Sequence, residues 1–252
     1  MKKKILYRTG AVVFWLLVWQ AASMVIGQEL LLVSPLTAVK KLWELLGTKE
    51  FRLSVGTTLL HILTGFVLSA LCGILLSALS GRFRLVRELC APLMHTIKAT
   101  PVASFVILAL IFVRSKYLSV LISFLMVLPI MYTNILAGID ATDKKLLEMA
   151  KLFRIGKWRT VCGIYLESIY PYLISACTLS LGMCWKSGIA AEVIGIPKHT
   201  IGSALYDAKL YFDTPSLFAW TLAIILLSLL LEKAMLLIVK LVGSSRAHGH
   251  TA

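Results

Sequence analysis

The chain has 252 residues, of which 59% are hydrophobic and only 15% are charged, and its formal net charge is +14. Its mean hydropathy of +0.87 lies far above that of a water-soluble domain, so a globular protein with a polar surface is excluded. In a soluble chain this positive charge would suggest nucleic acid. In a membrane protein it indicates loops that face anionic lipid, so we expect the lipid bilayer and no nucleic acid as a partner.

Six apolar runs are long enough to cross a bilayer as helices, which takes about 20 residues each. We expect spans at about residues 11–27, 56–80, 91–113, 117–138, 168–195 and 214–242. The prediction is an all-α integral membrane protein with a single transmembrane domain over residues 1–252. A basic start before the first run also suits a signal peptide, but the run is long for one and the charge pattern supports an uncleaved span.

Lysine and arginine residues in short loops indicate the cytoplasmic side of a membrane protein. With the N-terminus inside, fifteen of these residues fall in inside segments and eight in outside segments. We therefore expect a multi-pass protein with both termini in the cytoplasm.

The outside segment 28–55 contains the sequence "SPLTAVKKLWELLG", which predicts a short helix. Ser34 can cap this helix, and Pro35 suits its first position. Apolar side chains recur at helical spacing, so we expect an interfacial helix on the outer face. These side chains are Leu36, Val39, Leu42, Trp43 and Leu46.

A long cytoplasmic loop at about residues 139–167 contains "DATDKKLLEMAKLF", which predicts a helix with Asp140 or Thr142 as its N-cap. One face of this helix is apolar, and Gly156 permits a turn after it. A solvated basic connector would satisfy the positive-inside rule alone. A short helix that exposes apolar side chains to the cytosol is, however, expected to bury them in a partner's groove. The apolar face consists of Leu146, Met149, Ala150 and Phe153.

The sequence Glu148-Met149-Ala150, followed by a turn and by Pro171 at the return to the membrane, resembles the EAA loop of permease subunits of binding-protein-dependent ABC importers. Three further stretches are similar to the taurine, aliphatic sulfonate and nitrate permease branch: "TPVASFVILALIF" (100–112), "LPIMYTNILAGI" (128–139) and "GIAAEVIGIP" (188–197). The resemblance covers about residues 50–240. It implies the type I ABC importer permease fold, with six transmembrane helices and a cytoplasmic coupling helix.

In that family the loop docks into a cytoplasmic ATPase subunit. Two positions depart from the family pattern, because Arg154 stands where a Gly is usual and Glu167 where a Pro is usual. The resemblance implies that the ATPase-coupling residues are Leu146, Leu147, Glu148, Met149, Ala150, Lys151, Leu152, Phe153 and Gly156.

The chain has no GxxxxGK[ST] phosphate-binding loop, and its five cysteines show no metal-ligand spacing. We therefore expect no enzyme activity, no metal site and no cofactor in this chain, with ATP and Mg²⁺ bound by the partner ATPase subunit. The resemblance implies two copies of this permease, two ATP-binding subunits and an extracytoplasmic substrate-binding protein, in the bacterial cytoplasmic (inner) membrane. Specificity in such systems resides largely in the binding protein, so the cargo stays open.

Ionisable residues inside membrane spans mark candidate pathways. Lys98 suits either a water-filled cavity or a snorkelling position, whereas His61 and His95 also suit hydrogen-bonded packing. Glu192 lies six residues after Lys186 on a different helix face, and it matches the Glu of the family's "AE" motif, where it is interpreted as structural. If both lysines face the cavity, they favour an anionic cargo. The candidate pathway residues are Lys98, Thr100, Asn134, Lys186 and Glu192.

Two other classes of protein would require features that differ from those above. A secondary transporter or channel working without an ATPase would need an ion-coupling acid deep in the membrane and often has an internal repeat, and here only Glu192 could serve. An intramembrane enzyme would need a clustered nucleophile or metal set, and the sequence offers none.

Overall fold

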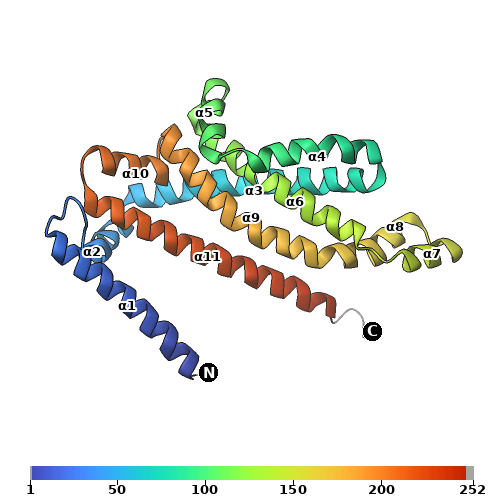
Figure 1. The fold of residues 1–252 in the computed structure, drawn as a ribbon, viewed down its shortest axis with the longest axis horizontal. Helices are drawn as coiled ribbons and strands as arrows, with labels where there is room; N and C mark the ends of the chain where they lie inside the picture. Colours follow the sequence, from blue (N-terminus) through green and yellow to red (C-terminus); the bar gives the residue numbers. More distant parts are fainter. Residues whose placement is uncertain (1, 248–252) are drawn as a thin grey trace. The chain divides into compact units, whose positions relative to one another are not determined.

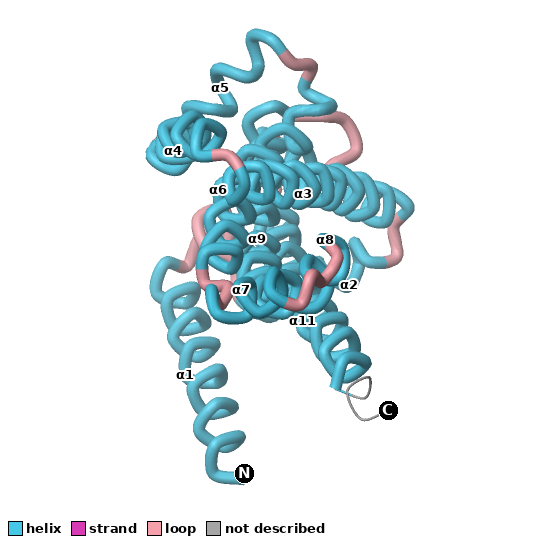
Figure 2. Tube along the Cα trace, turned by 90° about the vertical axis from the view of Figure 1, so that its right-hand side faces the viewer, coloured by secondary structure: helices cyan, strands magenta, loops and turns pink. Residues whose placement is uncertain are grey.

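The computed structural model describes the backbone of residues 2–247, with side chains described for residue 7 and residues 9–237. All regular structure in this range is helical, and short loops connect the helices (Figure 2). The elements are α1 (Lys2–Ile26), α2 (Pro35–Leu46), α3 (Lys49–Arg82), α4 (Arg84–Ala99), α5 (Val102–Phe112), α6 (Ser115–Asp140), α7 (Lys144–Leu152), α8 (Lys157–Thr160), the π-helical turn η1 (Val161–Tyr165), α9 (Leu166–Gly195), α10 (Ile201–Leu210) and α11 (Thr214–Ala247) (Figure 1).

Five helical segments of the described chain are long and apolar enough to cross a membrane. They are Thr9–Ile26, Lys49–Arg82, Ser115–Asp140, Lys157–Gly195 and Thr214–Leu237. α4 and α5 pass the same test together, but they are bent by 106° where they meet. The prediction of an all-α membrane protein is confirmed, and the number of spans reaches six when the bent pair counts as one.

The third predicted span, residues 91–113, is not the continuous helix that we expected. α4 ends at Ala99, and Thr100 adopts an extended conformation with φ −82° and ψ 128°. Pro101 explains the break, because proline lacks a backbone N–H and disfavours helical geometry in the residue before it. The helix restarts at Val102 in a new direction.

The chain divides into two compact units, each made of two stretches of sequence. The first comprises Met1–Thr57 and Ile196–Leu227, and the second comprises Thr58–Gly195 and Ser228–Ala252. Helices α3 and α11 each contribute to both units.

In the first unit, the helix predicted after Ser34 is present as α2. The Ser34 side chain caps it by accepting a hydrogen bond of 3.2 Å from the Thr37 amide. Leu42 is buried, whereas Leu36 and Trp43 are each 79% exposed. Burial therefore divides the apolar side chains of this helix between an inner and an outer face.

In the second unit, α6 packs along α9 (Figure 1). Inside a bilayer the hydrophobic effect does not drive helices together. Small residues stabilise their association there, because they allow the backbones to approach and pack closely. At Gly188 of α9, a Cβ atom would lie 2.6 Å from Ile62 of α3 and 2.7 Å from the Ser123 hydroxyl of α6. Three helices therefore meet at a position that only glycine fits without a shift.

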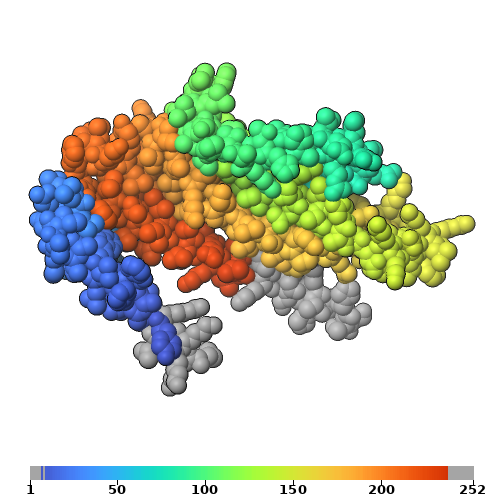
Figure 3. Space-filling view, viewed as in Figure 1, coloured from blue at the N-terminus to red at the C-terminus, as the bar shows by residue number. Residues whose placement is uncertain are grey.

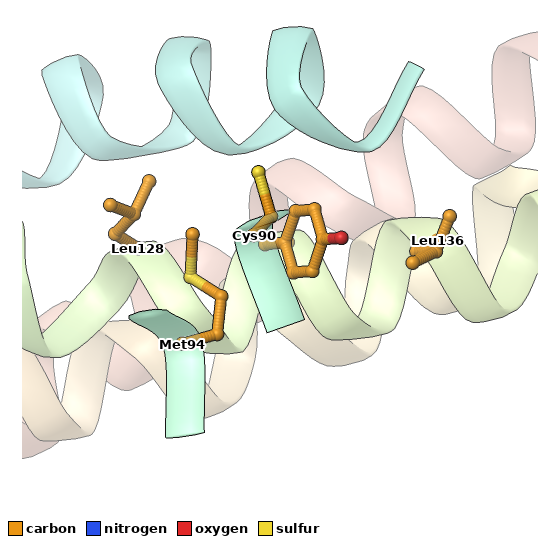
Figure 4. Close-up of a cluster of buried hydrophobic side chains, with 5 residues drawn as sticks. Cys90, Met94, Leu128 and Leu136 are labelled. Atoms are coloured by element: carbon orange, nitrogen blue, oxygen red, sulfur yellow. The ribbon is translucent and has the colours of Figure 1, made fainter. Parts of the chain in front are cut away.

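Along α3, a small residue recurs at every fourth position, and the three glycines among these residues face α6. At Gly73, a Cβ atom would lie 2.7 Å from the Cβ atom of Met131. An apolar cluster joins α4 to α6, and Cys72 and Leu76 of α3 pack against it; its buried members are Cys90, Met94, Leu128, Tyr132 and Leu136 (Figure 4). The small residues of α3 are Gly65, Ser69, Gly73, Ser77 and Gly81.

Candidate functional site

The predicted coupling helix is present as α7, but its N-cap is neither Asp140 nor Thr142. Asp143 holds this position, and its side chain accepts a hydrogen bond of 2.8 Å from the Lys145 amide. Asp140 is instead the last residue of α6, and the buried Thr142 side chain donates to the Gly138 carbonyl at 3.4 Å. An aspartate therefore caps the helix, but it is Asp143, three residues after Asp140 and one after Thr142.

The end of α7 is a Schellman motif, in which the last carbonyls of the helix accept from amides beyond it. The Ile155 amide donates to the Ala150 carbonyl at 2.8 Å, and the Arg154 amide donates to the Lys151 carbonyl at 3.1 Å. Arg154 has a φ of 52°, in the left-handed region that favours glycine. The turn residue is therefore Arg154, and Gly156, which we predicted, has an ordinary φ of −59°.

The predicted apolar face of α7 is split by the packing. Ala150 is 3% exposed, whereas Phe153 of the same predicted face is 71% exposed. Leu152, which was not predicted to belong to this face, is 80% exposed. In Figure 3, the α7–α8 region, in yellow, is not covered by other described segments on the side in view. We define the α7–α8 surface by its exposed apolar side chains: Leu146, Met149, Leu152, Phe153 and Trp158.

Trp158 was not among the residues singled out in the sequence. It lies in α8 between Lys157 and Arg159, and its side chain is 80% exposed. The available signal was a tryptophan between two basic residues, close in sequence to the apolar residues of α7, because neighbouring exposed apolar side chains form a patch that marks an interaction site.

Both ends of the loop are tied to the membrane helices. The Ser168 hydroxyl, near the start of α9, donates to the Gly138 carbonyl of α6 at 3.0 Å. Arg87 of α4 forms an ion pair with Asp140 at the end of α6 through both of its terminal nitrogens. Helix α7 is therefore attached to a base made from three helices of the second unit.

Three candidate pathway residues lie along α4 and α6. The Lys98 ammonium donates to the Thr133 hydroxyl at 3.3 Å and is exposed. Thr100, at the bend, donates to the Thr96 carbonyl at 2.8 Å. The Asn134 amide donates to the Ile130 carbonyl of its own helix at 2.8 Å.

Lys186 is exposed on α9 and lines a cavity of about 380 Å³ that α9 forms with α11. Glu232 of α11 lines the same cavity, and Lys98 does not. Within the described part of one chain, the two lysines thus lie at separate places.

Glu192 is fully buried, on a different face of α9 from Lys186. Its carboxyl accepts a hydrogen bond of 2.7 Å from the Thr58 hydroxyl of α3, and its other oxygen lies 4.0 Å from Nδ1 of His61. The sequence offered no signal for Thr58 beyond the rule that a buried carboxyl requires donors. The geometry agrees with a packing role for Glu192.

Comparison with known proteins places this architecture in one family. The family model of the "binding-protein-dependent transport system inner membrane component" matches residues 65–245. The chain is 23% identical to the nitrate import permease protein NrtB of Synechococcus elongatus, with 77% of this chain and 73% of that protein covered. It is also 23% identical to the putative aliphatic sulfonates transport permease protein SsuC of Bacillus subtilis, with 80% and 74% covered. A probable ABC transporter permease protein of Brucella melitensis is 23% identical, with 71% and 73% covered.

The chain belongs to the family of binding-protein-dependent transport system inner membrane components. It is a multi-pass membrane permease of the ABC importer type, and this family consists of transport subunits and not of enzymes. Such a permease implies a partner ATPase and a substrate-binding protein.

Proposed function

We propose that α7 is the coupling helix of this importer and that it docks into a groove of the cytoplasmic ATP-binding subunit. The observation that carries the proposal is the α7–α8 surface, because a basic loop exposes large apolar side chains such as Leu152, Phe153 and Trp158. An amphipathic helix of this kind binds by inserting its apolar residues into a groove. Glu148 and Lys151, both exposed, lie at the rim of this contact and select its register.

The partner supplies the chemistry that this chain lacks. ATP and Mg²⁺ bind to the ATP-binding subunit, and closure of two such subunits moves two copies of α7 together. The base formed with Arg87, Asp140 and Ser168 transmits this motion to α6 and α9. Two copies of this permease, two ATP-binding subunits and one extracytoplasmic binding protein form the assembly, with both termini of the permease in the cytoplasm.

The cargo is a small anion. The proposal is supported by the printed functions of two relatives, which concern nitrate and aliphatic sulfonates. It is further supported by Lys98 and Lys186, because an exposed ammonium group inside a span attracts an anion directly. Thr100 and Asn134 complete the candidate pathway on the α4–α6 side.

Replacement of two apolar side chains tests the docking. The double variant Leu152→Asp/Phe153→Asp should release the ATP-binding subunit, because each buried side chain contributes about 1.5–3 kcal/mol and an Asp does not enter an apolar groove. The measurement is the amount of ATP-binding subunit that co-purifies with the permease. The matched control is Leu30→Asp/Leu31→Asp, which changes two exposed leucines of the segment before α2. Full retention of the ATP-binding subunit by the α7 variant would overturn the proposal.

A second variant tests whether α7 must pack against its base. Ala150→Trp places a large ring where the side chain is 3% exposed, so α7 should be displaced from its base. We expect loss of uptake, with the permease still inserted in the membrane.

A further inference from the structure

A groove at the end of α3 next to the coupling loop has a basic end and an apolar end. The basic end is a cavity of about 520 Å³ lined by Arg82, Lys151 and Lys157, with Thr160 beside them. Among the residues whose side chains are described, no acidic one lines this cavity. The three cations take part in none of the ion pairs that the described residues form. Three like charges around one cavity repel each other, so an anion bound between them would relieve that repulsion.

The apolar end is a second cavity of about 350 Å³. It is lined by Ala78 and Gly81 of α3, Ile139 of α6 and Ile169 of α9, and these helices form the membrane part of the second unit. Arg82, Val161 and Tyr165 line both cavities, so the two are continuous. A ligand that fills the whole groove must therefore be anionic at one end and apolar at the other.

The wall shared by the two cavities has unusual backbone geometry. Val161 and Tyr165 are the first and last residues of the π-helical turn η1. π-helical turns are rare and occur frequently at functional sites. Here the wide turn places the side chains of Val161 and Tyr165 where the basic end of the groove meets its apolar end.

We propose that this groove binds one anionic phospholipid, with its phosphate at Arg82 and Lys157 and an acyl chain along Ala78, Ile139 and Ile169. Arginine suits the phosphate because its guanidinium forms paired hydrogen bonds with phosphate oxygens. The cytoplasmic leaflet supplies anionic lipid, and basic pockets between membrane helices on that side bind such head groups. This step rests on the cytoplasmic position of the loop in the proposed function. The bound lipid fills the space between α7 and the membrane helices and so sets the stiffness of the base of α7.

Lipid binding is measured on the purified full-length permease complex by native mass spectrometry. The probes are phosphatidylglycerol, phosphatidylcholine and inorganic phosphate, each added separately. We expect the complex to retain phosphatidylglycerol in preference to phosphatidylcholine. The variant Arg82→Gln/Lys157→Gln should bind phosphatidylglycerol at least about tenfold more weakly. The control Lys144→Gln/Arg159→Gln removes two exposed cations of the same loop that do not line the groove, and it should bind as the unaltered protein does.

A second variant separates a lipid from a free anion. Ala78→Phe fills the apolar end from an exposed position and leaves every charge in place. We expect it to weaken phosphatidylglycerol binding without changing the binding of inorganic phosphate. Equal retention of both lipids, an equal effect of the control pair, or no effect of Ala78→Phe would overturn the proposal. None of these results depends on ATPase docking or on uptake, so failure here leaves the proposed function standing.

Discussion

The hydroxyl of Thr58 in α3 donates a hydrogen bond of 2.7 Å to the carboxyl of Glu192 in α9, 134 positions further along the chain. Both side chains are fully buried, and His61 lies one turn away from Thr58 on the same helix. A buried carboxyl is tolerated only where donors meet it. This contact therefore fixes the register of α3 against α9.

Loss of this hydrogen bond should destabilise the membrane bundle. Thr58→Val keeps the shape of the side chain and removes a donor to Glu192, so we expect the free energy of unfolding to fall by about 1–3 kcal/mol. Thermal unfolding of the purified protein in detergent measures the effect. Thr64→Val is the matched control, since the Thr64 hydroxyl is exposed and donates to the Leu60 carbonyl of its own helix. Equal melting temperatures for the two variants would contradict the assignment.

Close packing at Gly188 predicts opposite effects for two glycines of one helix. Gly188→Ala should destabilise the bundle by about 1–3 kcal/mol, because the added methyl group meets Ile62 and Ser123. Gly182→Ala in the same helix meets no described atom within 4 Å and should be neutral or stabilising, since alanine is the better helix former. Thermal unfolding decides between the two directions. A loss of stability at residue 182 equal to that at residue 188 would refute the argument.

The left-handed conformation of Arg154 predicts a stabilising substitution. Arg154→Gly removes a strain of about 1 kcal/mol at the end of α7 and should slow hydrogen exchange of the α7 amides. Lys151→Gly is the matched control, because it lies in the helix, where glycine costs about 1 kcal/mol, and it should speed the exchange. Faster exchange in the Arg154→Gly variant would show that the arginine side chain stabilises the turn by contacts of its own.

Asp213 caps α11 outside the membrane spans, and its carboxylate predicts how stability depends on pH. Partial burial would raise the pKa of Asp213, but hydrogen bonds from the Ser216 hydroxyl and amide, helped by the charge of Lys41, lower this pKa below its ordinary value of 3.8. The carboxylate therefore stabilises the folded state fully above pH 3.8, and this contribution is lost as the pH falls through the lowered pKa.

Asp213→Ala should accordingly cost about 1 kcal/mol of stability, as for the loss of other helix caps. The cost should stay constant between about pH 5 and pH 8, because the carboxylate is ionised throughout that range. Thermal unfolding at several pH values measures it, and Asp213→Asn, which keeps a cap acceptor, should retain most of the stability. A cost that disappears at neutral pH would contradict the cap.

Stiff attachment of α7 predicts an uncoupling insertion. A Gly-Ser insertion between Ala141 and Thr142 leaves the ion pair of Arg87 with Asp140 intact but breaks the short link to α7. We expect the ATP-binding subunit to stay bound and to hydrolyse ATP, while cargo uptake into reconstituted vesicles is lost. The control insertion lies between Gln28 and Glu29, in an exposed segment before α2. Normal uptake after the first insertion would show that the loop only tethers its partner.

The sequence by itself determined the class of fold and the positions of most helices. Apolar runs of sufficient length form helices wherever a bilayer leaves the backbone no other partner, so this part of the fold depends on local composition alone. The cap at Ser34 and the helix formers of α7 are likewise local signals, and both helices are present. The motif from Glu148 to Ala150 indicated the family correctly because its residues are adjacent in the chain.

Only the tertiary structure decided which residues meet. The hydrogen bond of Thr58 to Glu192 and the groove between Arg82 and Lys157 join segments that are distant in the sequence. Ala150 is buried while Met149 of the same predicted face is exposed, a difference that periodicity does not predict. Helical periodicity predicts which side chains lie on one face, but it does not predict which helix packs against that face. The packing partner depends on contacts among several helices, such as those of α3 and α6 with Gly188 of α9. The bend at Thr100 has its cause in the adjacent Pro101, whereas its angle of 106° follows from the packing of α5 against α6 and α9.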